Sequence, residues 1–231
     1  MTASFLSSMS QVLWRILEAR SIDPRPVFLE AGLDPAQWNE PYTRFTNEGL
    51  DRAWGRATEL TQDPCIGLQA ARFVSPASLH ALGFAWLASD TLYDALSRLV
   101  RYSNLIGGDL ILELQLSGET CRLTVENVQI SGSSVLQRRD AFWASLLAMG
   151  RMITTDNLAP TGLELRRPEP ECAAAFYGLF QSPITFGTLR DSIAFDREVA
   201  ERPLPTANRV LAHTNDQVVE DYLAHVTAST F

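Results

Sequence analysis

The chain has 231 residues, of which 46% are hydrophobic, and its formal net charge is −8. A chain of this length and composition can bury a sizeable hydrophobic core, which argues against disorder. The chain is acidic overall, and arginine is its only strongly basic residue type. This argues against a chain that binds nucleic acid by itself, because neutralising phosphates requires a basic face.

Neither a membrane span nor a secretory signal is indicated. No window approaches about 18 consecutive apolar residues, and the first residues lack a basic region followed by an apolar one. We therefore predict a cytoplasmic protein without a membrane partner. The cysteines Cys65, Cys121 and Cys172 show no CxxC spacing, so we expect them to be reduced and mostly buried, with no metal site.

The first hundred residues carry helical patterns of short length. Apolar residues from Phe5 to Leu17 recur at intervals of three and four, which predicts one amphipathic helix. Asp-Pro pairs at Asp23, Asp34 and Asp63 predict helix starts, because aspartate caps a helix and proline suits its first turn. A longer helix is expected to begin near Thr46.

Two further helices complete this block. Ser75-Pro76 introduces a helix that we expect to continue through Ala88. The next helix runs from a cap at Ser89 or Asp90 to Gly107-Gly108, where the glycines end it. The region from residue 1 to 108 is thus predicted to be an all-helical block.

The period of the apolar pattern changes from residue 109. Alternation in DLILELQL and CRLTVEN, around the turn Ser117-Gly118-Glu119, predicts a β-hairpin with one buried face. A helix from Ser134 to Thr155 follows, then a strand from Thr161 to Arg166 and a helix from Glu171 to Phe180. We expect Ile184 to Phe186 and Ser192 to Phe195 to form a second strand pair around Gly187.

This order of elements predicts an α+β fold. Residues 1–108 form the helical block and residues 109–231 the α+β part, and the two together make one unit. The prolines of Pro203-Leu204-Pro205 then lead into a final helix that we expect Thr206 to cap and that runs to Phe231.

Recognisable catalytic and nucleotide-binding motifs are missing from the sequence. The histidines His80, His213 and His225 have no partner at metal-ligand spacing, so we predict no catalytic residue, no metal and no cofactor. Apolar and aromatic side chains do lie near arginines in the middle of the chain, a mixture suited to a cavity for an anionic or polar head on an apolar body. The predicted effector-binding residues are His80, Phe84, Trp86, Arg101, Tyr102 and Trp143. The alternative is that these aromatics are core residues and the arginines lie on the surface.

The final helix carries a stripe that is suited to self-association. Leu211, Asn215, Val218 and Tyr222 recur at intervals of three and four, and we predict that they form a homodimer contact. The alternative is that this face packs on its own domain.

Several stretches resemble one known family in the same order along the chain. They are Ala31 to Pro35, Leu60 to Leu68, Leu82 to Tyr102, Phe180 to Gly187, Ser192 to Phe195 and Arg202 to Asn208. The resemblance is to the N-terminal arabinose-binding-type domain, distinct from a cupin barrel, of AraC/XylS-family transcription regulators.

The resemblance implies an effector-sensing and dimerisation domain of a DNA-binding regulator. DNA would be bound only through a C-terminal part with two helix-turn-helix units, which this chain lacks, so the acidic charge is no contradiction. The effector would be a small molecule. One interpretation of the arginines and aromatics is that it carries a carboxylate and a partly apolar body. Two alternatives remain open, an effector-independent oligomerisation module and a small-molecule enzyme with an unmarked site.

Overall fold

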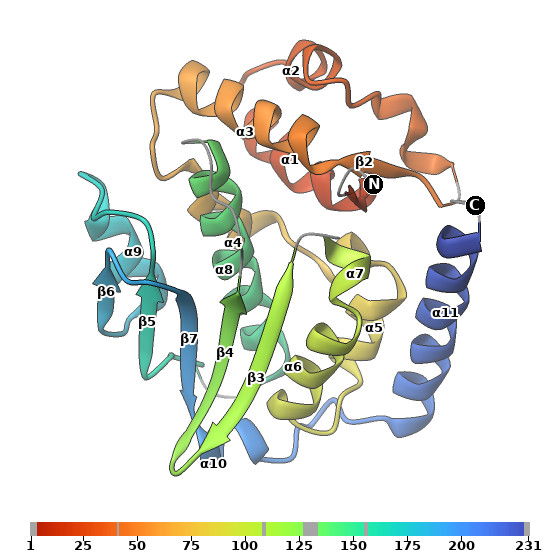
Figure 1. Cartoon of the computed structure of the whole chain (residues 1–231), viewed down its shortest axis with the longest axis vertical. Helices are drawn as coiled ribbons and strands as arrows, with labels where there is room; N and C mark the ends of the chain where they lie inside the picture. The colour runs from red at the N-terminus through yellow and green to blue at the C-terminus, as the bar shows by residue number, and fades with distance from the viewer. Residues whose placement is uncertain (1–3, 41, 108–109, 127–133, 155–156, 229–231) are drawn as a thin grey trace.

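A computed structural model of the chain describes residues 4–40, 42–107, 110–126, 134–154 and 157–228. Figure 1 shows a group of helices at one end of the molecule, a sheet at the other, and the helix α8 (Ser134–Ile153) leading from one to the other. The helical N-terminal part and the sheet confirm the α+β prediction. Three predicted end points, Gly108, Thr155 and Phe231, lie outside the described residues.

The N-terminal part is a set of short helices next to a small sheet. Its elements are β1 (Ser4–Leu6), η1 (Ser7–Ser10), α1 (Gln11–Ala19), α2 (Pro24–Glu30), η2 (Pro35–Asn39), β2 (Arg44–Thr46) and α3 (Asn47–Thr61). The prediction of one helix from Phe5 to Leu17 is wrong in its first half, because Phe5 pairs with Phe45 in an antiparallel ladder. Serines at 7, 8 and 10 favour turns over a helix interior, which suits the 3-10 segment found there. The block is therefore not all helical.

The predicted helix starts at Asp23 and Asp34 are confirmed. The carboxylate of Asp23 accepts a hydrogen bond from the Arg25 backbone N–H at 3.0 Å, and that of Asp34 from Ala36 at 3.0 Å. Thr46 caps α3 in the same way, accepting from Gly49 at 3.1 Å.

The central helices are shorter than the sequence pattern predicts. They are η3 (Ile66–Gln69), α4 (Ala70–Phe73), η4 (Pro76–Leu79), α5 (Ala81–Leu87), α6 (Leu92–Arg101) and α7 (Ser103–Ile106). The expected continuous helix from Ser75-Pro76 to Ala88 is wrong, because His80 has a φ of 52° and ends η4 before α5 begins. The cap of α6 is Thr91, which accepts from the Asp94 N–H at 3.0 Å, in place of the predicted Ser89 or Asp90.

The larger sheet has the strand order β3-β4-β7-β5-β6. Its strands are β3 (Ile111–Ser117), β4 (Thr120–Glu126), β5 (Gly162–Leu165), β6 (Ile184–Phe186) and β7 (Asp191–Asp196). The predicted β3–β4 hairpin is confirmed. The predicted second pair is wrong: β6 runs parallel to β5, whereas β7 inserts between β4 and β5. All side chains from Asp191 to Phe195 are buried, which fits the position of β7 between two other strands.

The last helices are α9 (Ala173–Phe180), α10 (Arg197–Glu201) and α11 (Arg209–Ala228). The segment before α11 is fixed to the end of α5, since the Asn208 N–H donates to the Ala88 carbonyl at 2.9 Å. The side chain of Asn208 also accepts from the Leu211 N–H at 3.0 Å. Asn208 therefore caps α11 in place of the predicted Thr206.

Buried apolar side chains gather in two clusters. We call the first the N-terminal cluster; it joins residues between Phe5 and Ala70 with Ala141 of α8. The second, the sheet cluster, packs α5, α6 and most of α8 against the larger sheet. The helix α8 contributes to both, so it connects them. The proposed division of the chain at residue 108 remains a prediction.

The cysteine prediction is wrong for two of the three residues. Cys65 and Cys172 form a disulfide, with their Cα atoms 6.3 Å apart and 107 positions apart in the chain. Cys121 is free and buried. The disulfide joins the residue before η3 to the residue before α9, two segments whose proximity arises only in the folded chain.

Candidate functional site

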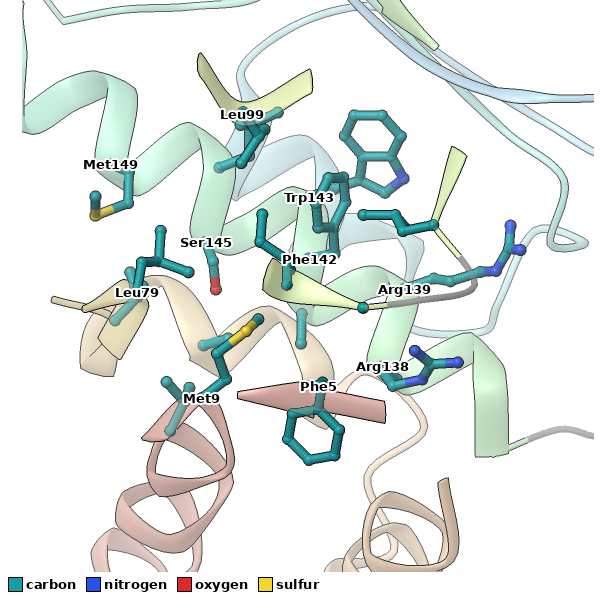
Figure 2. Close-up of a pocket in the computed structure, with 18 of the residues that line it drawn as sticks. Phe5, Met9, Leu79, Leu99, Arg138, Arg139, Phe142, Trp143, Ser145 and Met149 are labelled. Carbon is teal, nitrogen blue, oxygen red and sulfur yellow. The ribbon is translucent and has the colours of Figure 1, made fainter. Parts of the chain in front are cut away.

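A cavity of about 130 Å³ lies between the two clusters. Phe5, Leu50 and Trp54 line it from the N-terminal cluster, and Trp86 and Leu99 line it from the sheet cluster. Figure 2 shows side chains from these separate parts of the chain around one space. Anything held in this cavity therefore contacts both clusters at once.

The helix α8 provides one continuous wall of the cavity. Phe142, Trp143, Ser145, Leu146 and Met149 all line it, at the spacings that place residues on one side of a helix. The Ser145 hydroxyl is the polar group along this stretch, and Figure 2 shows it among apolar side chains. The end of the cavity that Leu79 and Met149 line therefore suits an apolar group.

Two tryptophans have fixed positions in the wall. Trp86 is buried, and its indole N–H donates to the Met149 carbonyl at 3.0 Å. Trp143 is equally buried and packs edge to face on Phe142, with ring centroids 5.0 Å apart. Because both rings are held by contacts within the protein, this part of the cavity is preformed.

The other end of the cavity is charged. Arg138 and Arg139 lie close together at one side of the view in Figure 2. The Nε of Arg138 donates to Asp51 of α3 at 2.7 Å, whereas Arg139 forms a much more buried ion pair with Asp191 of β7. Asp191 also accepts from the Arg166 backbone N–H at 2.6 Å. Burial lowers the pKa of Arg139, and the Asp191 carboxylate opposes that effect.

A third ion pair lies beside this charged end. Asp140, the next residue of α8, pairs with Arg167 after β5, and both side chains are almost fully buried. Burial raises the pKa of Asp140 to about 7, against the effect of the nearby guanidinium. Arg167 also lies over the ring of Phe176, with its guanidinium carbon 5.1 Å from the centroid. These contacts hold the first turns of α8 against the sheet.

The cavity includes two of the six predicted effector-binding residues, Trp86 and Trp143. Arg101 and Tyr102 instead donate to Glu220 of α11, at 2.9 and 3.0 Å. Burial raises the pKa of Tyr102 to about 12.

The two remaining predicted residues also lie away from the cavity lining. His80 is exposed and faces the ring of Tyr222 on α11, 6.0 Å away between centroids. Phe84 is 45% exposed on α5. The aromatic-rich segment around α5 therefore serves two surfaces, with Trp86 turned to the cavity and His80 to α11.

Sequence reasoning did not assign the polar lining residues Arg138, Arg139, Ser145 and Asp191 to a site. The one available signal was the arginine pair, which directly precedes the apolar pattern of α8. Asp191 comes from a strand more than fifty positions later, so its place beside Arg139 depends on the sheet order.

The predicted dimer stripe falls on two faces of α11. Leu211 and Val218 are 47% and 52% exposed, and the neighbouring Val210 is 78% exposed. Tyr222 is buried on the inner face, which packs on α5, and Asn215 is half-buried and donates to the Leu211 carbonyl at 2.9 Å.

Comparison with known proteins gives the family. Residues 22–204 match the family described as the arabinose-binding domain of AraC transcription regulators, N-terminal. The chain belongs to this family. Within the described residues, no helix is long and apolar enough to cross a membrane, and no group of three or more histidine, cysteine or acidic side chains is placed to hold a metal ion.

Two relatives of this arabinose-binding domain come from Pseudomonas aeruginosa. The ornithine utilization regulator is 22% identical over 216 residues, which cover 93% of this chain and 63% of the relative. The crystal structure of the transcriptional regulator CdpR superposes with a TM-score of 0.66 at 17% identity, over 89% of this chain and 60% of that one. The chain thus spans less than two thirds of either regulator, and the likeness to CdpR shows the fold.

Proposed function

We propose that this chain is the effector-sensing and dimerisation domain of an AraC-type transcription regulator, and that its effector is a small molecule held in the cavity. The observation that carries this proposal is the position of the cavity between the N-terminal cluster and the sheet cluster. A ligand that contacts both clusters favours the arrangement that closes on it, so occupancy shifts the balance between two arrangements. A coupling of about 1–3 kcal/mol is enough to change the affinity for a partner roughly 5- to 150-fold.

The regulator's DNA contact is proposed to belong to another part of the whole protein. The net charge of this chain is −8, which opposes binding to phosphates. Helix-turn-helix units place a recognition helix in the major groove, and two such units in a dimer need a fixed spacing. The sensing domain would control that spacing or orientation.

Dimerisation is proposed through the outer face of α11. Val210, Leu211 and Val218 are exposed apolar side chains on this helix. A two-fold dimer uses the same patch on both copies, and one helix face can meet its own copy in this way. Tyr222 stays within its own domain, so our dimer proposal keeps Leu211 and Val218 with Asn215 at the edge.

Sedimentation at micromolar concentrations tests the dimer. Val218→Glu places a charge in the apolar stripe and should shift the chain to monomer, while Gln217→Glu adds the same charge beside it and should have a smaller effect. A wild-type chain that is monomeric at every concentration would contradict this part of the proposal.

An effector-independent oligomerisation module is the second candidate, and the exposed stripe on α11 is compatible with it. An enzyme receives less support, because the charged cavity-lining residues within the described chain, Arg138, Arg139 and Asp191, form ion pairs that fix the protein's own elements. Both relatives are regulators, which also favours a sensor over an enzyme.

A matched pair of variants tests the cavity as the effector site. Ser145→Phe puts a phenyl ring into the cavity, whereas Ala175→Phe puts one on the exposed side of α9. An engineered cavity of about 150 Å³ holds one benzene, so the new ring should fill most of this space.

The readout is the melting temperature with a panel of small carboxylates, amides and amino acids, ornithine included. A ligand at about ten times its Kd adds roughly 1.4 kcal/mol, which raises the melting temperature by about 3–5 °C in a chain of this size. Ser145→Phe should abolish the rise and Ala175→Phe should keep it. A panel in which no compound raises the wild-type melting temperature would favour the oligomerisation module.

A further inference from the structure

The two ends of the cavity differ in chemistry. Leu79 and Met149 lie at one end in Figure 2, and Arg138 and Arg139 lie at the other. The volume of about 130 Å³ limits a ligand to roughly a single ring with a short side group. The apolar end can hold the ring, so the chemistry of the other end decides whether the ligand also carries a charge.

The arginines at the second end are neutralised by the protein itself. Arg139 forms an ion pair with Asp191, whose side chain is 4% exposed, and Arg138 forms one with Asp51. Asp191 also accepts from the Arg166 backbone N–H. Arg138, Arg139 and Asp51 have further interactions besides these pairs. The two guanidinium groups and their two carboxylates therefore leave no net charge for a ligand to neutralise.

A charged ligand would have to break one of these pairs or stay unpaired in the cavity. Displacing Asp191 or Asp51 would leave a largely buried carboxylate without its partner, which is costly. A ligand carboxylate that displaced neither would find both guanidinium groups already paired, and an ammonium would find both carboxylates paired. Either charge would also lose its hydration. The cavity therefore favours an uncharged ligand.

The Ser145 hydroxyl on α8 is available to a ligand. Serine and threonine inside a helix commonly donate to the carbonyl four residues earlier, as Thr58 and Ser97 do here at 2.8 Å. Within the part of the chain that the structure describes, Ser145 forms neither this hydrogen bond nor another. Figure 2 shows its oxygen pointing away from the α8 ribbon among the lining side chains. A ligand can therefore use this hydroxyl without displacing a contact of the protein.

We propose that the effector is an uncharged molecule with an apolar body of about one ring and one hydroxyl or carbonyl group, which forms a hydrogen bond with Ser145. This inference rests on the proposed function of the cavity. A serine hydroxyl both donates and accepts, so it can pair with either group. Because α8 contributes to both clusters, the hydrogen bond would fix the ligand on the helix that connects them.

Four probes that share one carbon skeleton test the charge of the ligand. Calorimetric titration of the chain at neutral pH compares toluene, benzyl alcohol, benzoate and benzylammonium. Benzyl alcohol should bind about three- to tenfold more tightly than toluene, because it adds one neutral hydrogen bond. Benzoate and benzylammonium should each bind at least about tenfold more weakly than benzyl alcohol, because each must bury a charge. Binding of either ion as tightly as benzyl alcohol would overturn the inference.

Ser145→Ala tests the hydrogen bond, and Ser97→Ala is its control. Ser97 is a half-buried helical serine that does not line the cavity. Alanine is a better helix former than serine, so both variants should keep the fold. Ser145→Ala should remove the preference for benzyl alcohol over toluene, and Ser97→Ala should keep it. A merely structural role would weaken both probes alike, so a preference that survives in Ser145→Ala would contradict the assigned hydrogen bond.

The outcomes also separate this inference from the proposed function. If benzoate binds most tightly of the four and Ser145→Phe blocks it, the cavity is a ligand site but the uncharged assignment is wrong. If none of the four probes binds, this inference is overturned. The wider panel of melting temperatures then decides whether the proposed sensing function fails with it.

Discussion

The N-terminal cluster and the sheet cluster are built in different ways. The first uses helices that follow one another between Phe5 and Ala70, and α2, η2 and α3 each begin at a side-chain cap. The second brings together strands and helices from distant positions, with β7 between β4 and β5. The difference teaches that each cluster has its own core, and that α8 with a few specific contacts holds them together around the cavity.

The largest expected effect comes from the disulfide between Cys65 and Cys172. In the chain-entropy account, a link across a loop of about 100 residues stabilises by roughly 4–5 kcal/mol. We expect Cys172→Ser to lower the free energy of unfolding by up to about that amount, measured in urea. A reducing agent should have the same effect on the wild type and no further effect on Cys172→Ser. Equal stability of the oxidised and reduced wild type would show that this link contributes nothing.

The next effect is expected at the contact between η3 and α8. A Cβ atom added at Gly67 would lie 2.2 Å from the Gln137 carbonyl oxygen, which is backbone and cannot turn away. Gly67→Ala should therefore cost about 2–3 kcal/mol. Gly178→Ala is the control, since nothing lies within 4 Å of its new Cβ and alanine favours a helix. Ordinary surface substitutions change the free energy of unfolding by up to about 0.5 kcal/mol. A loss below that value in Gly67→Ala would mean that α8 moves freely over η3.

A smaller effect is expected within the N-terminal cluster. Asp34→Ala removes the side-chain acceptor at the start of η2 and should lower stability by about 1 kcal/mol. Asp34→Asn keeps an acceptor and should cost less. Because none of the residues of η2 lines the cavity, ligand affinity should stay unchanged in both variants, and a change of tenfold or more would show that η2 influences the cavity.

Whether the sequence predicted a feature correctly depends on how far apart its interacting residues lie along the chain. The caps at Asp23 and Asp34 and the β3–β4 hairpin depend on neighbours along the chain, and the pattern predicted them correctly. The place of β7 depends on its pairing with β4 and β5, which no local pattern carries. The disulfide was not predicted for the same reason, since 107 positions separate its cysteines.

The cavity shows the same limit. Trp86 and Trp143 were predicted as lining residues because they are large aromatic side chains near arginines, and both line it. Arg101 and Tyr102 satisfied the same reasoning but bind Glu220 of α11. Arg138 and Arg139 belong to the cavity because η3, α3 and β7 meet α8 at its first turns, which the sequence pattern of α8 does not reveal.

The central claim, that a small molecule binds between the two clusters, is tested most directly by tryptophan fluorescence during a ligand titration. Three of the five tryptophans, Trp54, Trp86 and Trp143, line the cavity. With the compound that gives the largest rise in melting temperature, we expect a saturable change in emission that Ser145→Phe abolishes and Ala175→Phe retains. A saturable change that persists unaltered in Ser145→Phe would place the ligand elsewhere and contradict the account.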